Sequence, residues 1–474
     1  MKRRSFLLGA AGAAVSVLAR RSGRAQSAFR LRVAYQDPGQ PIAPDFIGLS
    51  YESAILAAGD YFTPDNSSTL GLIRSLGDRG VIRIGGNTSE RTIWNTNTTA
   101  TDRAAVSITP RTIDRLAAAL RLLRWKLIYG LNLARGTPAE AADEAEYVAN
   151  AVGPNLLAFQ IGNEPDGFGR WTAVRPNSYD VTAYLSEWRR FHAAIRAKVP
   201  DASFAGPDVA GATDWVAALA GARPQRLVLL THHYYADGPA GAPHLSLEKL
   251  LQHDGWIAPL LQRLASDSHA YRLPFRITET NSIYGEGQPG ISDTLGDALW
   301  GLHLMFQVAA AGAAGINFHG GAHNLRRGED KAYTPIARGG DGHYRAMPLY
   351  YGMVMFARAA RGALVPATLV PELDRLKAFA VRAPEGSLQV CLINKSGTQG
   401  ERVEIDPGRK FSVASIARLA GPALAATTGV TLSGASIDES GKWAPATIDE
   451  VHLTSRALVV EIPAASAALI SMHE

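Results

Sequence analysis

The chain has 474 residues, of which 46% are hydrophobic, and it contains a single cysteine, Cys391. This length exceeds that of an ordinary single domain, so one large domain with a smaller companion is expected, and one cysteine excludes an intramolecular disulfide or a zinc–thiolate cluster. The formal net charge of +5 arises at the N-terminus, where Lys2, Arg3, Arg4, Arg20, Arg21 and Arg24 occur without an acidic residue. The remaining chain is close to neutral, which argues against a nucleic-acid-binding surface.

The N-terminus has the features of an export signal. The pair Arg3-Arg4 precedes an apolar segment that runs to about Ala19, and small residues follow around positions 25–28. This arrangement predicts a bacterial twin-arginine signal peptide over residues 1–28 and a periplasmic or extracellular location. Its apolar part is too short to span a membrane stably, and no later segment is long and apolar enough, so no membrane attachment is expected.

Apolar runs typical of buried parallel strands then alternate with amphipathic helices. One helix is predicted after Thr109, which suits an N-cap and is followed by Pro110. The apolar runs cover residues 46–52, 80–86, 125–133, 155–165, 202–208, 226–235, 275–280 and 315–319. Eight strands, each followed by a helix, predict an α/β fold with a (β/α)8 barrel over residues 41–355.

The pattern of apolar and polar residues changes after about Phe356. Short alternating runs, separated by Gly, Ser and Pro turns, occupy residues 376–382, 388–393, 401–405 and 457–462. These features predict an all-β sandwich over residues 356–474. The alternating segment Phe29 to Tyr35 precedes the barrel, so we expect residues 29–40 to join this sandwich.

Two carboxylates lie where predicted barrel strands end. Glu164 ends the fourth strand within Asn163-Glu164-Pro165, and Glu279 ends the seventh. A barrel brings these strand ends to one mouth, although either acid alone could be an ordinary surface group. Two facing carboxylates are the minimal equipment for glycoside hydrolysis, provided that their environments separate their pKa values so that one is protonated and the other ionised.

The motifs together resemble those of glycoside hydrolase family 79, the β-glucuronidase and heparanase family, and especially its bacterial exo-β-glucuronidases. The resemblance rests on Ile161-Gly-Asn-Glu-Pro165, His232-His-Tyr-Tyr235 and Ile277-Thr-Glu-Thr-Asn-Ser-Ile-Tyr-Gly285. Residues 46–52, 83–86 and 348–352 also fit, so it extends over most of the barrel. The resemblance implies a (β/α)8 barrel with a β-domain that includes an N-terminal strand.

The resemblance also implies residue roles. Glu164 matches the general acid/base, Glu279 the nucleophile, and Asn163 the amide that contacts the sugar 2-hydroxyl. Tyr234 matches the tyrosine that holds the nucleophile, with a packed core aromatic as the alternative. Glu52 matches an acid that binds outer sugar hydroxyls. By their position, Asn87 is assigned to the same subsite and Tyr333 to a contact with the sugar carboxylate.

The loop from Tyr284 to Gly290 is expected to recognise the uronate carboxylate. In relatives, the corresponding loop binds it through a tyrosine hydroxyl and backbone amides, here Tyr284 with Gly285 and Glu286. Glu286 departs from the family pattern because heparanase has glycine there, and its side chain must turn away from an anionic sugar. The glycines at 285, 287 and 290 also match a dinucleotide fingerprint, but Pro289 removes an amide from the phosphate cradle, so no nucleotide cofactor is expected.

Three further polar positions follow barrel strands. Arg83 is expected to be a buried arginine paired with barrel carboxylates. The pair His232-His233 is expected to pack in the core or to support the catalytic residues without acting as a catalyst, and no metal set accompanies it. His319, at the end of the eighth strand, either faces the sugar or fills the mouth of the barrel.

The sequence therefore predicts a retaining, exo-acting β-glucuronidase that works by double displacement without cofactor or metal. A retaining β-glycosidase for a neutral sugar and a non-catalytic carbohydrate-binding protein remain the alternatives. A carbohydrate is the expected partner, with no nucleic acid or membrane, and a monomer or weak oligomer is expected. The near-neutral charge favours a small terminal glucuronide over a sulfated polysaccharide.

Overall fold

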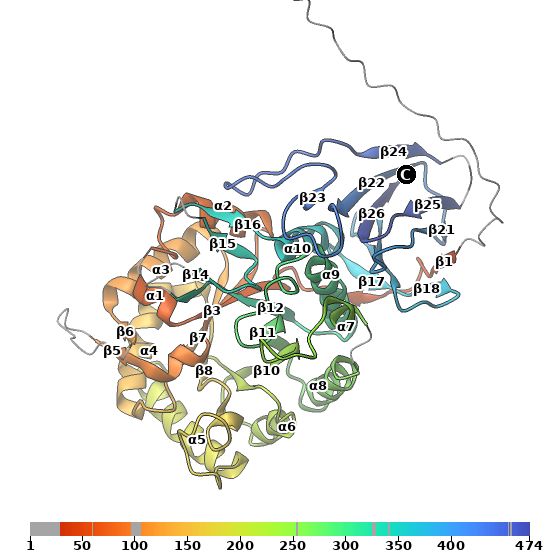
Figure 1. Ribbon diagram of the computed structural model, residues 1–474. Helices are drawn as coiled ribbons and strands as arrows, with labels where there is room; N and C mark the ends of the chain where they lie inside the picture. Colours follow the sequence, from red (N-terminus) through yellow and green to blue (C-terminus); the bar gives the residue numbers. More distant parts are fainter. Residues whose placement is uncertain are drawn as a thin grey trace, which may run out of the picture.

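The computed structural model describes residues 29–474 except 59, 96–105, 253–254, 325–328, 340–341, 454 and 456, so the predicted signal peptide lies outside the described residues. Eight parallel strands close into a barrel at the centre of the larger part (Figure 1). They are β3 (Ile47–Glu52), β4 (Val81–Gly85), β7 (Lys126–Leu131), β8 (Leu156–Ile161), β9 (Phe204–Val209), β10 (Leu227–Asp237), β11 (Phe275–Ile283) and β12 (Gly315–Gly320). The predicted (β/α)8 fold is confirmed.

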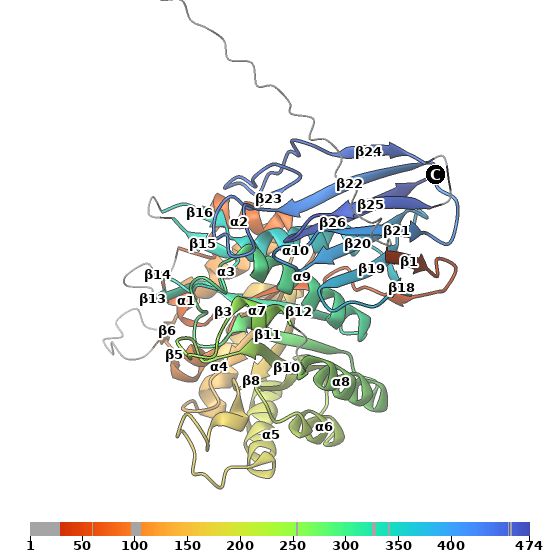
Figure 2. The same cartoon turned by 45° about the vertical axis from the view of Figure 1, so that its right-hand side comes forward.

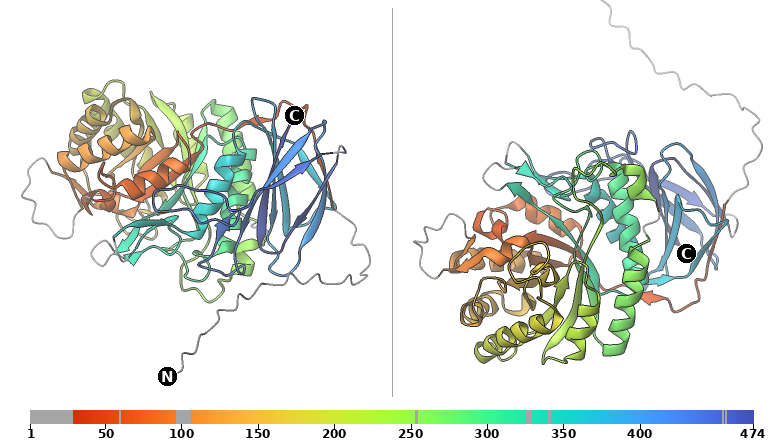
Figure 3. Two further views of the ribbon diagram at one scale, coloured as in Figure 1. Left: turned by 90° about the horizontal axis from the view of Figure 1, so that it is seen from above. Right: turned by 60° about the horizontal axis from the view of Figure 1, so that its bottom comes forward.

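Helices cover the outside of the barrel (Figure 3). The main ones are α2 (Ser67–Ser75), α3 (Pro110–Leu123), α4 (Pro138–Val152), α5 (Val181–Lys198), α6 (Asp214–Gly221), α8 (Ile257–Tyr271), α9 (Leu295–Ala310) and α10 (Pro348–Ala359). Helices α3 and α4 each begin with a capping box, on Thr109 and Thr137, followed by proline at the first helical position. None of the described helices is long and apolar enough to cross a membrane.

Two antiparallel-rich sheets form the smaller part of the molecule. The first has the order β18-β1-β21-β25, with β1 (Phe29–Val33), β18 (Ala367–Val370), β21 (Glu401–Asp406) and β25 (Leu458–Ile462). The second contains β2 (Gln40–Pro41), β17 (Ala363–Val365), β19 (Leu376–Arg382), β20 (Leu388–Asn394), β22 (Val413–Ala420), β23 (Thr431–Leu432), β24 (Asp449–His452) and β26 (Ser466–His473). The N-terminal strand β1 lies between β18 and β21, so both ends of the chain contribute to these sheets.

The two parts share a hydrophobic core. Helices α9 and α10 lie between the barrel and the larger sheet (Figure 2). Phe306 of α9 stacks on Phe379 of β19, with 4.5 Å between the ring centroids. Ile393 and Leu469 of that sheet belong to the same buried cluster as the barrel residues. A second core, which includes Leu31, Val403 and Ile470, fills the space between the two sheets.

Short elements at the carboxyl ends of the barrel strands shape the mouth. After β4 come η1 (Asn87–Arg91) and β5 (Thr92–Trp94), which pairs with β6 (Val106–Ile108). After β12 come two hairpins, β13 (Ala322–Asn324) with β14 (Glu329–Asp330) and β15 (Ile336–Arg338) with β16 (Tyr344–Ala346). The segment between β14 and β15 carries Lys331 and Tyr333 into the mouth.

Candidate active site

Glu164 and Glu279 face each other at the mouth of the barrel. One oxygen of each carboxylate lies within 4.8 Å of the other. Glu164 follows β8 in a left-handed conformation (φ +46°), which its backbone N–H stabilises by donating to the carbonyl of Asp208 at 2.9 Å. Pro165 then begins the short helix η3 (Pro165–Gly167). Glu279 lies within β11, on a strand that is buried throughout.

Arg83 of β4 connects the residues around both carboxylates. Its guanidinium is buried and donates hydrogen bonds to Glu279, to Asp208 and to the side-chain oxygen of Asn163. The expectation of a buried arginine paired with barrel carboxylates is confirmed. Because one rigid cation binds all three groups, Arg83 fixes the nucleophile candidate relative to the amide beside Glu164.

The surroundings of Glu279 favour its ionised form. Tyr235 Oη donates to Glu279 Oε1 at 2.8 Å, and His319 Nδ1 lies 3.6 Å from Oε2. Burial alone would raise the pKa of Glu279, but the nearby ring of His319 and the charges of His233 and Arg83 outweigh it and lower this pKa to about 2. Glu279 is therefore a carboxylate throughout the neutral range.

The surroundings of Glu164 favour its protonated form. Burial raises the pKa of Glu164, and the carboxylates of Glu279 and Asp166 add to this, although a hydrogen bond from His233 opposes it. His233 Nδ1 lies 2.9 Å from Glu164 Oε1. The two facing carboxyl groups thus have pKa values shifted in opposite directions, as an acid and nucleophile pair requires.

His233 bridges two acidic side chains. Its Nε2 lies 3.0 Å from Asp208 Oδ1, on the other side of the ring from Glu164. Burial would lower the pKa of His233, but the charges of Asp208 and Glu279, with the hydrogen bonds to Asp208 and Glu164, raise it to about 10. His233 is therefore an imidazolium at neutral pH and donates to Glu164. The neighbouring His232 packs behind the site, and burial lowers its pKa to about 4.

The tyrosine that binds the nucleophile candidate is Tyr235, and not Tyr234 as expected from the sequence. Side chains alternate along a strand, so His233 and Tyr235 of β10 point into the mouth. Tyr234 points the other way and is buried within the hydrophobic core. The alternation identifies Tyr235 once His233 is known to point into the mouth.

Asn163, Asn87 and Glu52 lie together on the side of the mouth formed by β3 and β4. The Asn163 side-chain amide donates to Asn87 Oδ1 at 3.3 Å. Glu52 Oε2 accepts from the backbone N–H and the hydroxyl of Thr88, at 2.8 and 2.7 Å. Burial would raise the pKa of Glu52, but Lys331, His319 and Thr88 lower it well below its usual range. Glu52 is therefore ionised at neutral pH.

The loop after β11 and the segment after β14 form a further wall of the mouth, next to Glu52. Tyr284 and Tyr333 lie on two sides of Tyr235, with ring centroids 6.4 and 6.1 Å away. Gly285 and Glu286 both have a φ of +79°, and the Glu286 carbonyl accepts from the backbone N–H of residue 332 at 2.8 Å. The loop is thereby fixed against the Tyr333 segment.

Glu164, His233 and Glu279 are close enough together to be considered as ligands of a metal ion. The donor chemistry does not suit one. Both ring nitrogens of His233 already lie at hydrogen-bond distance from carboxyl groups, those of Glu164 and Asp208, and the buried Arg83 guanidinium already binds Glu279.

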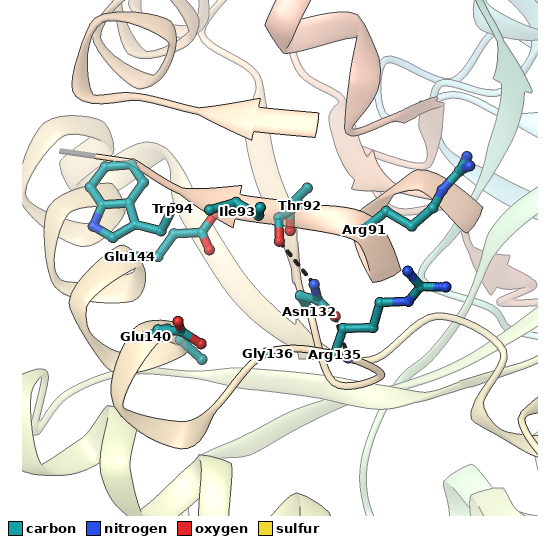
Figure 4. Close-up of a pocket in the computed structure, with 10 residues that line it drawn as sticks. Arg91, Thr92, Ile93, Trp94, Asn132, Arg135, Gly136, Glu140 and Glu144 are labelled. Atoms are coloured by element: carbon teal, nitrogen blue, oxygen red, sulfur yellow. Dashed lines mark hydrogen bonds between the residues drawn. The ribbon is translucent and has the colours of Figure 1, made fainter. Parts of the chain in front are cut away.

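A separate cavity of about 320 Å³ lies beside the mouth, between β5 and the start of α4 (Figure 4). Arg91 and Arg135 extend to one side of it, and Trp94 lies at the other end. It is lined by Arg91, Thr92, Ile93, Trp94, Asn132, Arg135, Gly136, Glu140, Ala141 and Glu144.

Glu90, just before this cavity, is buried and accepts hydrogen bonds from the backbone N–H groups of Asn163 and Ala134. It therefore holds the loop that carries Glu164.

Sequence reasoning did not identify Glu90, Asp208 or Lys331 as site residues. Asp208 ends the predicted fifth strand, so its position alone could have suggested it. Lys331 and Glu90 lie in irregular segments whose path the hydrophobic pattern does not specify. His233 was expected either to pack or to support the catalytic residues, and its contact with Glu164 corresponds to the second of these roles.

Comparisons with known proteins find β-glucuronidases that are similar in sequence and glycoside hydrolases that are similar in structure. No family model matches the chain. An Aspergillus niger β-glucuronidase is 26% identical over an alignment of 542 positions, which covers 99% of this chain and 98% of that protein. A Neurospora crassa β-glucuronidase is 27% identical over 345 positions, covering 63% and 61%. The structure of a 4-O-α-L-rhamnosyl-β-D-glucuronidase from Fusarium oxysporum matches with a TM-score of 0.78 at 20% identity, covering 93% of this chain and all of that one. An α-L-arabinofuranosidase from Thermotoga maritima matches with a TM-score of 0.70 at 14% identity, covering 94% and 99%. The last two likenesses concern the fold.

Proposed function

We propose that this protein is a retaining, exo-acting β-glucuronidase of glycoside hydrolase family 79 that releases terminal glucuronate. The observation that carries the proposal is the pair Glu164 and Glu279, whose carboxylate oxygens approach within 4.8 Å and whose pKa values are shifted apart. Retaining enzymes need carboxyl groups about 5 to 5.5 Å apart, whereas inverting enzymes need about 6.5 to 9.5 Å to admit water. The full-length similarity to a curated β-glucuronidase supports the choice of sugar.

In the first step, Glu279 attacks the anomeric carbon while Glu164 protonates the departing oxygen. Arg83 and Tyr235 stabilise the ionised form of Glu279 and fix the position of its carboxylate. His233 binds Oε1 of Glu164, so the transferred proton comes from Oε2. The glycosyl–enzyme bond forms as the glycosidic bond breaks, and Glu164 becomes a carboxylate that the His233 imidazolium stabilises.

In the second step, Glu164 takes a proton from water, which attacks the anomeric carbon and releases Glu279. Asn163 is held between Arg83 and Asn87. We propose that the remaining N–H of its amide binds the sugar 2-hydroxyl. The wall formed by Tyr284, Tyr333 and the amides of Gly285 and Glu286 receives the sugar carboxylate. The near-neutral charge of the chain beyond the N-terminal segment favours small terminal glucuronides as substrates.

A panel of aryl β-glucuronide, β-glucoside, β-galactoside and β-xyloside tests the proposal. We expect efficient cleavage of the uronide alone, with β-glucuronate as the first product by NMR. Glu279→Gln should lose nearly all turnover, and Glu164→Ala should lose it mainly for poor leaving groups. Preferential cleavage of a neutral glycoside would move the assignment to the neutral-sugar alternative. Full activity of both variants, or release of the α-anomer, would refute the site or the retaining mechanism.

Residues 1–28 are proposed to direct export by the twin-arginine route. The basis is the Arg3-Arg4 pair before an apolar segment. Replacing both arginines by lysine should keep the protein in the cytoplasm of a host with this pathway, as measured by fractionation. A lysine pair that is exported as well as the wild type would contradict the proposal.

A further inference from the structure

Lys331 is a buried cation at the mouth of the barrel, with 5% of its side chain exposed. Its Nζ lies 2.9 Å from His319 Nε2 and 3.5 Å from Glu52 Oε1, and 5.9 Å from the centre of the Tyr333 ring. A lysine side chain costs free energy to bury unless its charge is compensated. The position of Lys331 between Glu52 and Tyr333 places this charge where the glycone would lie.

The other cations of the mouth each contact two carboxyl groups, whereas Lys331, among the described residues, forms an ion pair with Glu52 alone. Arg83 binds Asp208 and Glu279, and His233 lies between Asp208 and Glu164. An ammonium group has three N–H donors. Within the part of the chain that the structure describes, the contacts of Lys331 account for two of them, one toward His319 and one toward Glu52. One donor remains for a bound group.

The contact with His319 also fixes the tautomer of that ring. Because an ammonium can only donate, His319 Nε2 must accept, and the proton lies on Nδ1. Nδ1 then donates to Ser50 Oγ at 3.0 Å and faces Glu279 Oε2. Burial and the Lys331 charge lower the pKa of His319, against the carboxylates of Glu279 and Glu52. Since His319 stays neutral, it adds no full charge for an anionic sugar.

We propose that Lys331 is a specificity-determining residue of the glycone subsite and supplies the positive charge that lets an anionic sugar, a hexuronate, bind beside Glu52 and Glu279. This inference rests on the proposed function, because it concerns the sugar that the same site accepts. Tyrosine hydroxyls and backbone amides can hold either a carboxylate or a neutral amide at this wall. A buried ammonium distinguishes the two by charge.

The test compares two ligands of nearly the same shape, D-glucuronate and the neutral D-glucuronamide. Their Kd values are measured by titration calorimetry on the wild type and on Lys331→Met and Lys331→Arg. Lys198→Met is the control, because it removes a lysine from the outer surface of the barrel. Neither ligand has a glycosidic bond, so the measurement does not depend on turnover.

We expect the wild type and Lys198→Met to bind glucuronate at least about tenfold more tightly than glucuronamide, a ratio typical of one desolvated charge contact. In Lys331→Met the ratio should fall to about twofold, with the Kd of glucuronamide nearly unchanged, and Lys331→Arg should restore most of the preference. If Lys331→Met leaves the ratio of the two Kd values unchanged, or weakens the binding of both ligands equally, Lys331 only supports Glu52 and His319. Failure of the wild type to cleave aryl β-glucuronides would instead refute the proposed function, whatever the ratio.

Discussion

Adjacent tyrosines on β10 allow a sharp test of the site. Tyr235→Phe removes the hydroxyl that donates to Glu279 at 2.8 Å and leaves the ring in place. A hydrogen bond to a buried charged group contributes about 1.5 to 3 kcal/mol. Since about 1.4 kcal/mol corresponds to a factor of ten in rate, kcat/KM should fall by about 10- to 150-fold if this bond is needed in the transition state.

Tyr234→Phe is the matched control, because it makes the same chemical change on the opposite face of the same strand. Its kcat/KM on an aryl β-glucuronide should stay within about threefold of the wild type, while its Tm changes by a few degrees at most. Both variants are assayed at one pH, with circular dichroism to verify folding. The reasoning is refuted if Tyr234→Phe loses as much activity as Tyr235→Phe, or if Tyr235→Phe retains wild-type kinetics.

Two further predictions concern stability and loop position. The pKa of His233 is raised to about 10, above its unfolded value of about 6.5, so its contribution to stability is complete below that value and is lost as the pH rises through about 10. The pKa of Glu279 is lowered to about 2, so its contribution to stability is lost as the pH falls from about 4.5 through 2. A plot of Tm against pH should therefore decline at both ends. In His233→Gln, the decline of Tm at alkaline pH should be smaller. In Glu90→Gln, one backbone N–H, that of Asn163 or Ala134, loses its acceptor. The variant should therefore lose about 1 to 3 kcal/mol of unfolding free energy. Its kcat should fall by a larger factor than its KM rises. Glu140→Gln, at an exposed capping box, should leave kcat unchanged, and equal kcat values for the two variants would contradict the role of Glu90.

The barrel could be predicted from the sequence because each buried strand is a continuous apolar run with a helix signal after it. The positions of Glu164 and Glu279 followed from the same pattern, since a carboxylate that ends such a run must emerge at the mouth. The strand pairing in the sheets of the smaller part was harder to predict from the sequence. Strand β22, with the sequence VASIARLA, alternates weakly, and its register depends on pairing with β24 and β26.

The remaining site residues depend on contacts that a sequence pattern does not encode. Lys331 is polar and lies in a short connection, which ordinarily indicates solvent exposure, yet Glu52 and His319 bury it. The assignment of Tyr234 failed by one position because a motif match does not by itself specify which face of a strand meets the mouth. Both cases required the strands to be closed into a barrel before neighbours from distant segments could be identified.

The charge arrangement explains how one mouth keeps two carboxyl groups in different protonation states. Arg83 carries a permanent charge and contacts Glu279 but not Glu164, so it stabilises the ionised form of one acid only. His233 contacts Glu164, but its charge is shared with Asp208 on the other side of the ring. Glu164 is therefore left with burial and the repulsion of the ionised Glu279, both of which favour its protonated form. When Glu279 becomes a glycosyl ester, that repulsion disappears, the pKa of Glu164 falls, and the same residue is prepared to act as a base in the second step.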